Sequence, residues 1–292
     1  MKLVDIPRLA NAADLELAAR RIVEGLYAGR HRSPFTGSAV EFSDHRAYQP
    51  GDDLRAVDWK AFARSDHLLI RRYHEERDLP LVLVVDSSAS MDYGQPSKAA
   101  WAATAAAALA LLAVDQGDRV RLACGAATLD SVSPEVGGAG GVARLLVQLA
   151  AAVPRGPSDL PRLIDDLARR LERRTVVVLI SDLLVDPAAL SGPLGALAAR
   201  GHELSAIQVL DRSEIDLPAA WGLSALADPE GATAALTCDA AAAKPGYDAL
   251  MQGHLSACRR LLASCRGDHL LASTAEHVAD VLGGWLRRRR KR

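Results

Sequence analysis

The sequence predicts an α/β fold with a doubly wound, mostly parallel sheet, an N-terminal extension and a C-terminal elaboration of a hairpin and helices. Apolar strands alternate with helical segments between residues 79 and 210, which is the pattern of βαβ units. The strand at 81–86 shows no polar alternation, as expected of a strand buried on both faces. A chain of 292 residues, 49% of them hydrophobic, is long enough to bury such a sheet.

The first half of the chain is assigned from apolar spacing. Residues 11–27 have helical spacing, with Asn11 or Asp14 as the cap, and residues 30–76 are irregular and charged, ending in a strand at 67–73. The long Ala/Leu run that follows strand 81–86 predicts a helix at 97–116. Further strands are expected at 118–125 and, at an edge of the sheet, near 127–133.

The second half continues the alternation after a glycine-rich break at 137–141. Two apolar stretches at 222–227 and 233–238, joined through Asp228 to Gly231, predict a hairpin. The chain is therefore divided into a helix and extension (1–78), a sheet domain (79–210) and an elaboration that completes or covers the sheet (211–292). The remaining expected helices are 142–152, 159–173, 187–200, 245–265 and 275 onward, and the remaining strands are 175–181, 203–210 and 269–272.

The most informative motif is Asp86-x-Ser88-x-Ser90, which follows directly on strand 81–86. Ligands of open α/β sheets bind at the carboxyl ends of the strands. One carboxylate and two hydroxyls at alternate positions can turn three oxygens toward a common point, and such ligands suit Mg²⁺. By itself, the motif fits an ordinary Asx turn with a helix N-cap as well as it fits a metal-binding loop.

This motif resembles the first loop of the metal-ion-dependent adhesion site of von Willebrand factor A domains. The resemblance implies a von Willebrand factor A-like, Rossmann-type fold, a hydroxyl from a later loop and a second aspartate after another strand. Ser158 is the candidate hydroxyl, although the family usually has Thr there, and the neighbouring Asp159 is either an alternative ligand or a helix N-cap. The expected metal ligands are Asp86, Ser88, Ser90, Ser158 and Asp182.

A second resemblance lies upstream, in a charged segment at 41–75. The segment reads Glu41-Phe42, then Arg46-x-Tyr48-x-x-Gly51-Asp52-Asp53-x-Arg55-x-Val57-Asp58-Trp59, then Arg64, Leu68 and Arg71 to Glu75. It resembles the block before the A-type domain in the bacterial family catalogued as domain of unknown function 58. That family is commonly encoded near MoxR-type AAA+ ATPases, which implies such a partner. This segment either forms a polar network that ties it to the A-type domain or provides a surface for binding a partner.

The resemblance implies a non-enzymatic protein-interaction module. It would bind Mg²⁺, or Mn²⁺ or Ca²⁺, and leave one position for a carboxylate from a protein partner. The alternative is a metal-dependent phosphoryl-transfer or hydrolytic enzyme. The sequence has no phosphate-binding loop, dinucleotide fingerprint or nucleophile elbow, its histidines show no ligand spacing, and Lys98 is assigned to capping or solvating the next helix. An enzyme is therefore not expected.

Charge and cysteine usage point to a cytoplasmic protein. The net charge of −1 gives no general attraction to nucleic acid or anionic membranes, and the four cysteines form no C-x-x-C pair. No transmembrane segment is expected, because the apolar run 99–114 is short and bounded by charges. The terminal cations at 287–292 suit a helix C-terminus, with phosphate or membrane binding as the alternative.

Overall fold

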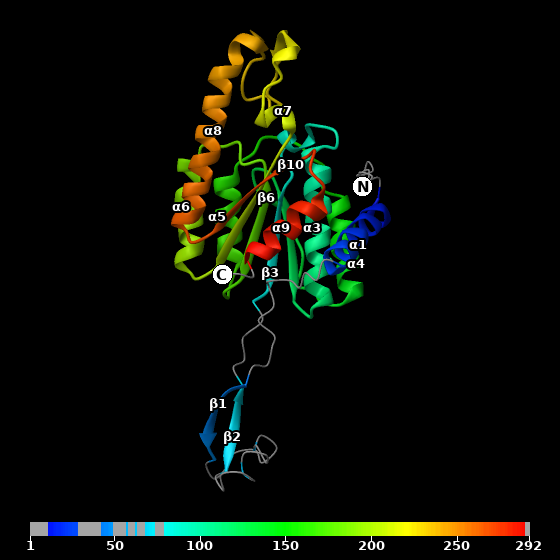
Figure 1. The fold of residues 1–292 in the computed structure, drawn as a ribbon, viewed down its shortest axis with the longest axis vertical. Coiled ribbons are helices and arrows are strands. Elements are labelled where there is room, and N and C mark those ends of the chain that lie inside the picture. Colours follow the sequence, from blue (N-terminus) through cyan, green and yellow to red (C-terminus); the bar gives the residue numbers. More distant parts are fainter. Residues whose placement is uncertain are drawn as a thin grey trace. The chain divides into compact units, whose positions relative to one another are not determined.

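The computed structural model describes residues 11–28, 42–48, 57, 62, 68–73 and 79–289 (Figure 1). The chain divides into two compact units, one made of residues 1–35 and 79–292 and the other of residues 36–78. In the second unit, β1 (Phe42–Ala47) and β2 (Leu69–Tyr73) pair antiparallel. The sequence predicted β2 but not β1, whose polar run Ser-Asp-His-Arg lacks an alternating apolar pattern. Most of the charged segment at 41–75 lies outside the described residues.

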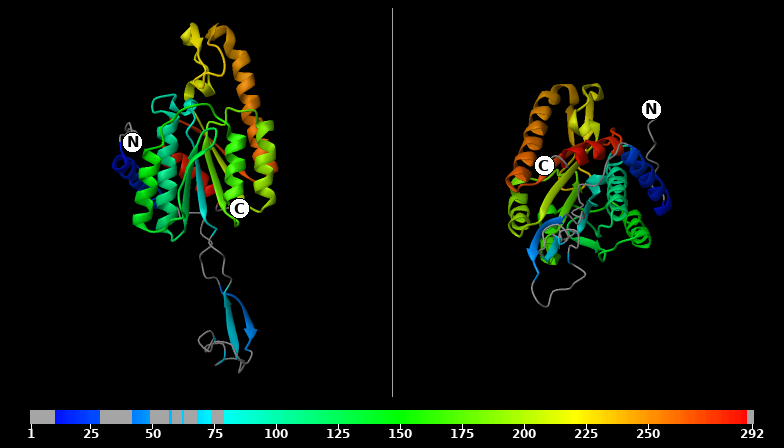
Figure 2. Two further views of the ribbon diagram at one scale, coloured as in Figure 1. Left: turned by 180° about the vertical axis from the view of Figure 1, so that it is seen from behind. Right: turned by 60° about the horizontal axis from the view of Figure 1, so that its bottom comes forward.

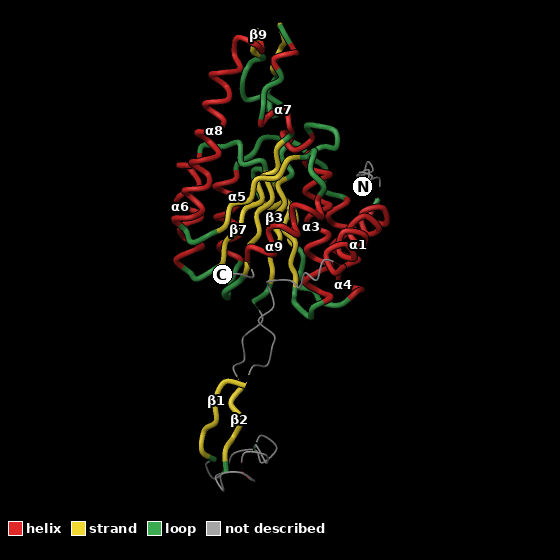
Figure 3. The backbone as a smooth tube through the Cα atoms, in the orientation of Figure 1, coloured by secondary structure: helices red, strands yellow, loops and turns green. Residues whose placement is uncertain are grey.

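The first unit is built on a six-stranded sheet (Figure 3). Its strands are β3 (Leu81–Asp86), β4 (Val120–Gly125), β5 (Leu129–Val132), β6 (Val176–Ser181), β7 (Glu203–Leu210) and β10 (Asp268–Ser273). Their order is β10-β7-β6-β3-β4-β5, and all neighbours are parallel except β5, which runs antiparallel to β4. This is the doubly wound order of Rossmann-type folds, and it confirms the predicted von Willebrand factor A-like fold class.

Helices cover both faces of the sheet (Figure 2). One face carries α1 (Ala12–Ala28), α3 (Lys98–Asp115), α4 (Ala139–Ala150) and α9 (Val278–Arg289), and the other carries α5 (Leu160–Arg170), α6 (Pro187–Ala199) and α8 (Ala240–Ser264). Within the described residues, α3 alone is long and apolar enough to span a membrane, but 72% of it is buried inside the protein. Its alanines allow the helix to lie close against the sheet.

Helix α1 belongs to the first unit. Asn11 caps it by accepting hydrogen bonds from the backbone N–H groups of Ala13 and Asp14, at 2.9 and 3.0 Å. Its buried residues line one side of the helix and join the core formed with α3 and α4: Leu15, Ala19, Ile22, Val23 and Leu26. The sequence grouped this helix with the segment up to residue 78, whereas its apolar face packs into the core of the sheet unit.

The C-terminal elaboration contains the predicted hairpin. After α7 (Arg212–Ile215) and the short 3₁₀ turn η3 (Ala219–Trp221), β8 (Leu223–Leu226) pairs antiparallel with β9 (Leu236–Asp239). Helix α8 begins at Ala240, five residues before the predicted start. The Asp239 side chain caps it there by accepting from the N–H of Ala241 at 3.0 Å, and Pro245 is accommodated inside the helix.

The end of the chain is partly structural. Arg289 in the last turn of α9 donates to the Ser205 hydroxyl at 2.6 Å and to the Glu203 carboxylate at 3.1 Å. At least one cation of the basic run therefore packs against the domain, and residues 290–292 lie outside the described part of the chain.

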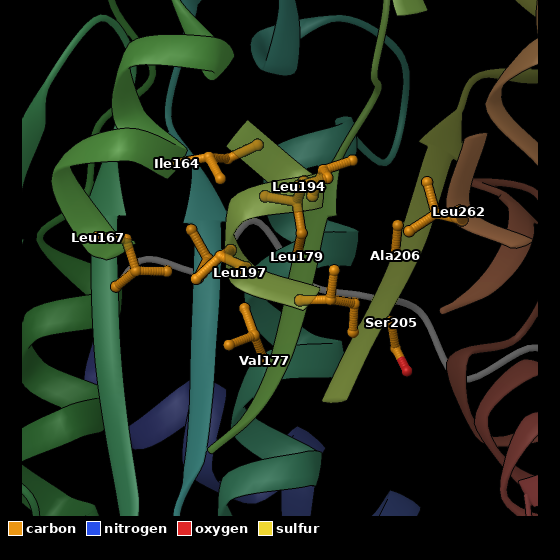
Figure 4. Close-up of a pocket in the computed structure, with 11 residues that line it drawn as sticks. Ile164, Leu167, Val177, Leu179, Leu194, Leu197, Ser205, Ala206 and Leu262 are labelled. Carbon is orange, nitrogen blue, oxygen red and sulfur yellow. The ribbon is translucent and has the colours of Figure 1, made fainter. Parts of the chain in front are cut away.

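A small gap in the core lies between the sheet and helices α5, α6 and α8 (Figure 4). Its lining is apolar apart from Ser205, and the hydroxyl of that residue is engaged by Arg289. A ligand pocket needs convergent polar groups as well as apolar walls. This gap is therefore a feature of core packing and not a ligand site.

Candidate metal centre

Asp86 ends the central strand β3 at the point where the winding of the sheet reverses. The chain leaves β3 toward β4 and later returns to its other side with β6, so the carboxyl ends of β3 and β6 meet at the crevice where such folds bind ligands. The Asp86 side chain is 1% exposed. Its Oδ1 accepts from the N–H of Ser88 at 2.9 Å, and its Oδ2 accepts from the Ser181 hydroxyl at 2.6 Å. Two strands thus fix the direction of this carboxylate.

Ser88 and Ser90 present two buried hydroxyls beside Asp86. Their Oγ atoms are 3.1 Å apart, and the turn η2 (Ala89–Asp92) that holds them has no side-chain cap. The bond from Ser88 N–H to Asp86 is an Asx turn, as one interpretation of the motif expected. The following helix, however, is capped by Ser97, which accepts from the N–H of Ala100 at 3.2 Å. The hydroxyls of Ser88 and Ser90 are therefore not needed as helix caps.

Ser158 lies on a loop that is fastened to the first loop by backbone hydrogen bonds. Ala89 N–H donates to Gly156 O at 2.9 Å, and Arg155 N–H donates to Ser87 O at 2.8 Å. The Ser158 Oγ is buried and has no hydrogen-bond partner among the described residues. A buried polar group without a partner costs about 1–3 kcal/mol. An oxygen-seeking cation would satisfy this hydroxyl.

The neighbouring Asp159 has a different task. Its carboxylate accepts from the N–H of Arg162 at 3.1 Å and caps α5. Of the two candidates for the third loop position, Ser158 therefore keeps its oxygen available, while Asp159 is the helix cap.

Asp182 follows β6 and is paired with a buried lysine. Its Oδ2 lies 2.8 Å from Lys98 Nζ, and its Oδ1 accepts from the N–H of Leu184 at 3.2 Å. Lys98 Nζ also lies 2.7 Å from Glu214 Oε1, and its side chain is fully buried. Burial lowers the Lys98 pKa, but the two carboxylates outweigh this effect and the pKa is raised overall. The assignment of Lys98 to capping or solvating α3 is therefore wrong.

Glu214 is aimed at Lys98 by a capping box. Asp211 N–H donates to Glu214 Oε2 at 2.8 Å, and Asp211 Oδ1 accepts from the N–H of Ser213 at 2.9 Å. The Asp-x-x-Glu spacing of this box is visible in the sequence. The position of Lys98 in the first turn of α3 also indicates nearby carboxylates, because the helix dipole disfavours a cation at that end of a helix.

Asp86 carries a charge that the protein does not balance directly. Burial raises its pKa to about 6, and the charge of Asp182 adds to this effect, while hydrogen bonds from Ser181 and Ser88 oppose it. Within the described part of the chain, Asp86 forms no ion pair, since Lys98 pairs with Asp182 and Glu214. A buried carboxylate without a counter-charge is a favourable place for a cation.

The structure brings Asp86, Ser88, Ser90 and Asp182 close together, and it places Ser158 on a loop that is bonded to the loop after β3. The donors are hydroxyl and carboxylate oxygens, which suit a hard cation such as Mg²⁺. The described residues contain no cluster of three or more His, Cys, Asp or Glu side chains, so a site of that composition is not found among them. The sequence missed the supporting side chains Ser181, Lys98 and Glu214.

The chain is similar to a protein family, to several proteins and to several solved structures. The family described as protein of unknown function DUF58 matches residues 44–256. Uncharacterized proteins of Mycobacterium bovis and Mycobacterium tuberculosis are each 37% identical over 223 residues, which is 74% of this chain and 69% of either relative. The conserved hypothetical protein BatB from Bacteroides thetaiotaomicron is 15% identical, with a TM-score of 0.49 over 73% of this chain and 100% of that chain. The pilus adhesin SpaC from Lactobacillus rhamnosus GG is 10% identical, with a TM-score of 0.45 over 88% and 36%.

We expect Lys98→Met to lower the free energy of unfolding by about 3–5 kcal/mol, because it leaves two carboxylates without their cation. Lys244→Met is the matched control: its ion pairs with Asp216 and Asp248 are exposed to solvent, and losing them should change the free energy of unfolding far less. Urea unfolding measures both variants. Equal small losses would show that the Lys98 cluster does not stabilise the fold.

A second prediction concerns Asp86 and pH in the presence of a chelator. The carboxyl titrates at 3.8 in the unfolded chain and at about 6 in the folded chain. Between these values the folded protein holds a proton that the unfolded chain has released, so stability falls as pH rises. Asp86→Asn should abolish this loss, which amounts to about 3 kcal/mol at roughly 1.4 kcal/mol per pH unit.

The variant should therefore match the wild type near the lower end of that pH range and exceed it in stability at neutral pH. Urea unfolding at a series of pH values tests this. A stability difference that stays constant with pH would contradict it.

Proposed function

This chain belongs to the family described as protein of unknown function DUF58, and we propose that it is a non-enzymatic protein-interaction module with a divalent-cation site. Mg²⁺ is the proposed ion, with Mn²⁺ or Ca²⁺ as alternatives. The proposed ligands are Asp86, Ser88, Ser90, Ser158 and Asp182. One observation carries the proposal: the partnerless Ser158 hydroxyl lies on a loop bonded to the loop of Asp86, a buried carboxylate that has no counter-charge.

The ligand set supports a binding role. Hydroxyl ligands are neutral, so a bound cation would keep enough positive charge to attract one more carboxylate. The chain's own part is to hold the ligands: Ser181 and the N–H of Ser88 orient Asp86, and Lys98 orients Asp182. The remaining position would accept an acidic side chain of a protein partner.

The surrounding groups favour binding over catalysis. Lys98 is held between two carboxylates and its raised pKa keeps it protonated, so it is unsuited to act as a base. His254 contacts the loop after β6, where its Nε2 lies 2.9 Å from the backbone oxygen of Leu183. The side chains of Lys98 and His254 are thus held by contacts that stabilise the loops, which favours binding over proton transfer.

The partner and the compartment are proposed on other grounds. A MoxR-type AAA+ ATPase is the proposed partner, on the strength of the family resemblance of the segment at 41–75. The proposed location is the cytoplasm, and the four free cysteines are compatible with a reducing compartment. Work with an ATPase suggests a role in the maturation or assembly of other proteins.

Calorimetry of Mg²⁺ binding tests the site. The wild type should bind, and Asp86→Ala should weaken binding by at least roughly tenfold, since the loss of even an outer-shell group of a metal site costs that much. Asp92→Ala is the control, because Asp92 is an exposed carboxylate on the same turn. Equal binding by all three proteins, or binding by none, would refute the site.

A pull-down tests the partner. The full chain should retain a MoxR-type ATPase from the same organism in the presence of Mg²⁺, and a chelator or Asp86→Ala should release it. Retention that neither treatment changes would separate the partner from the metal site. Release of phosphate from a phosphate ester by the purified chain alone would instead favour the enzymatic alternative.

A further inference from the structure

The hairpin loop between β8 and β9 brings a carboxylate onto the metal-site loop. Glu230 Oε2 accepts from the N–H of Ser158 at 2.9 Å, a contact between residues 72 positions apart. Figure 1 shows the hairpin, in yellow, beyond α7 at one end of the sheet. Ser158 is the residue whose hydroxyl has no partner among the described residues. The Glu230 carboxylate is therefore bound to the backbone of a proposed metal ligand.

The turn that presents Glu230 is fixed by its own hydrogen bonds. Gly231 N–H donates to Asp228 O at 3.1 Å, and Gly231 has a φ of 71°, a left-handed conformation that glycine adopts easily. The Asp228 carboxylate accepts from the N–H of Glu230 at 2.9 Å and from the N–H and hydroxyl of Thr233 at 3.0 and 3.2 Å. A preformed turn reduces the entropy lost when its side chain binds.

Glu230 has no cation of its own. It is half-buried, and it forms no ion pair with any residue that the structure describes. Glu230 adds a negative charge to the loop that carries Ser158, and a divalent ion bound at the proposed site would attract it.

We propose that Glu230 is the chain's own carboxylate ligand for the cation site. This inference rests on the proposed function and deepens it. Glu230 takes the position that a partner's acidic side chain takes in the complex, and a bound cation holds the hairpin on the site. A partner therefore has to displace Glu230, and the hairpin controls access to the metal.

The test compares Glu230→Gln with the wild type and with Glu203→Gln, a carboxylate at the start of β7, at the end of the parallel strands opposite to the proposed site. Glutamine keeps an oxygen that can accept from Ser158 N–H, so a purely structural role of Glu230 would leave this variant unchanged. The two readouts are Mg²⁺ affinity by calorimetry and hydrogen–deuterium exchange of residues 228–233 with and without Mg²⁺.

We expect Glu230→Gln to bind Mg²⁺ roughly tenfold more weakly than the other two proteins. Mg²⁺ should slow exchange at 228–233 in the wild type and in Glu203→Gln, but not in Glu230→Gln. If Mg²⁺ binds all three proteins equally and protects the turn equally, the inference is wrong while the metal site stands. If the wild type binds no Mg²⁺, both the site and the inference fail.

Discussion

The buried ion cluster of Lys98, Asp182 and Glu214 is the interaction on which the strand-end region depends. It joins the start of α3 to the end of β6 and to the short helix α7. Along the chain, Lys98 is 84 residues from Asp182 and 116 residues from Glu214. Lys98 balances one of the two carboxylates that it contacts, and the nearby carboxylate of Asp86 pairs with no cation among the described residues. A divalent ion bound at the strand ends would balance the remaining negative charge.

The same region keeps features that do not favour stability. A buried carboxylate with a raised pKa and a buried hydroxyl without a partner both work against the folded state, and both lie on the loops that follow β3 and precede α5. Strand β6, which is fully buried, contains no charged residue. Departures of this kind are expected where a protein binds something.

The sequence predicted most of the fold because its signals are local. Apolar runs located β3 and β6, apolar spacing and Asn11 located α1, and the Asp228 to Gly231 turn located the hairpin. The strand β1 was missed because its residues are polar, and α8 was predicted to start five residues too late although Asp239 supplies its cap. Asp86, Ser88 and Ser90 were recognisable for the same reason: they lie within five residues of each other.

The supporting part of the site was not predictable in this way. Lys98 meets Glu214, and Ser158 meets Glu230, only after the sheet has brought distant segments to one edge. No periodicity within a short window contains that information. The capping box at Asp211 and the unfavourable position of Lys98 in α3 gave hints, but each has a local explanation until the partners are seen together.

Helix α8 connects the hairpin to the core of the sheet unit. The helix has 25 residues, or about 37 Å at 1.5 Å per residue. Its buried residues beyond Ala240 lie at Met251, Leu255, Cys258 and Leu262, so the second half packs on the sheet. The first half is held to α7 and the residue after it, because the Tyr247 hydroxyl donates to Glu214 O at 2.6 Å and Lys244 forms an ion pair with Asp216. Any movement of the hairpin is therefore coupled through α8 to α7, whose Glu214 pairs with Lys98.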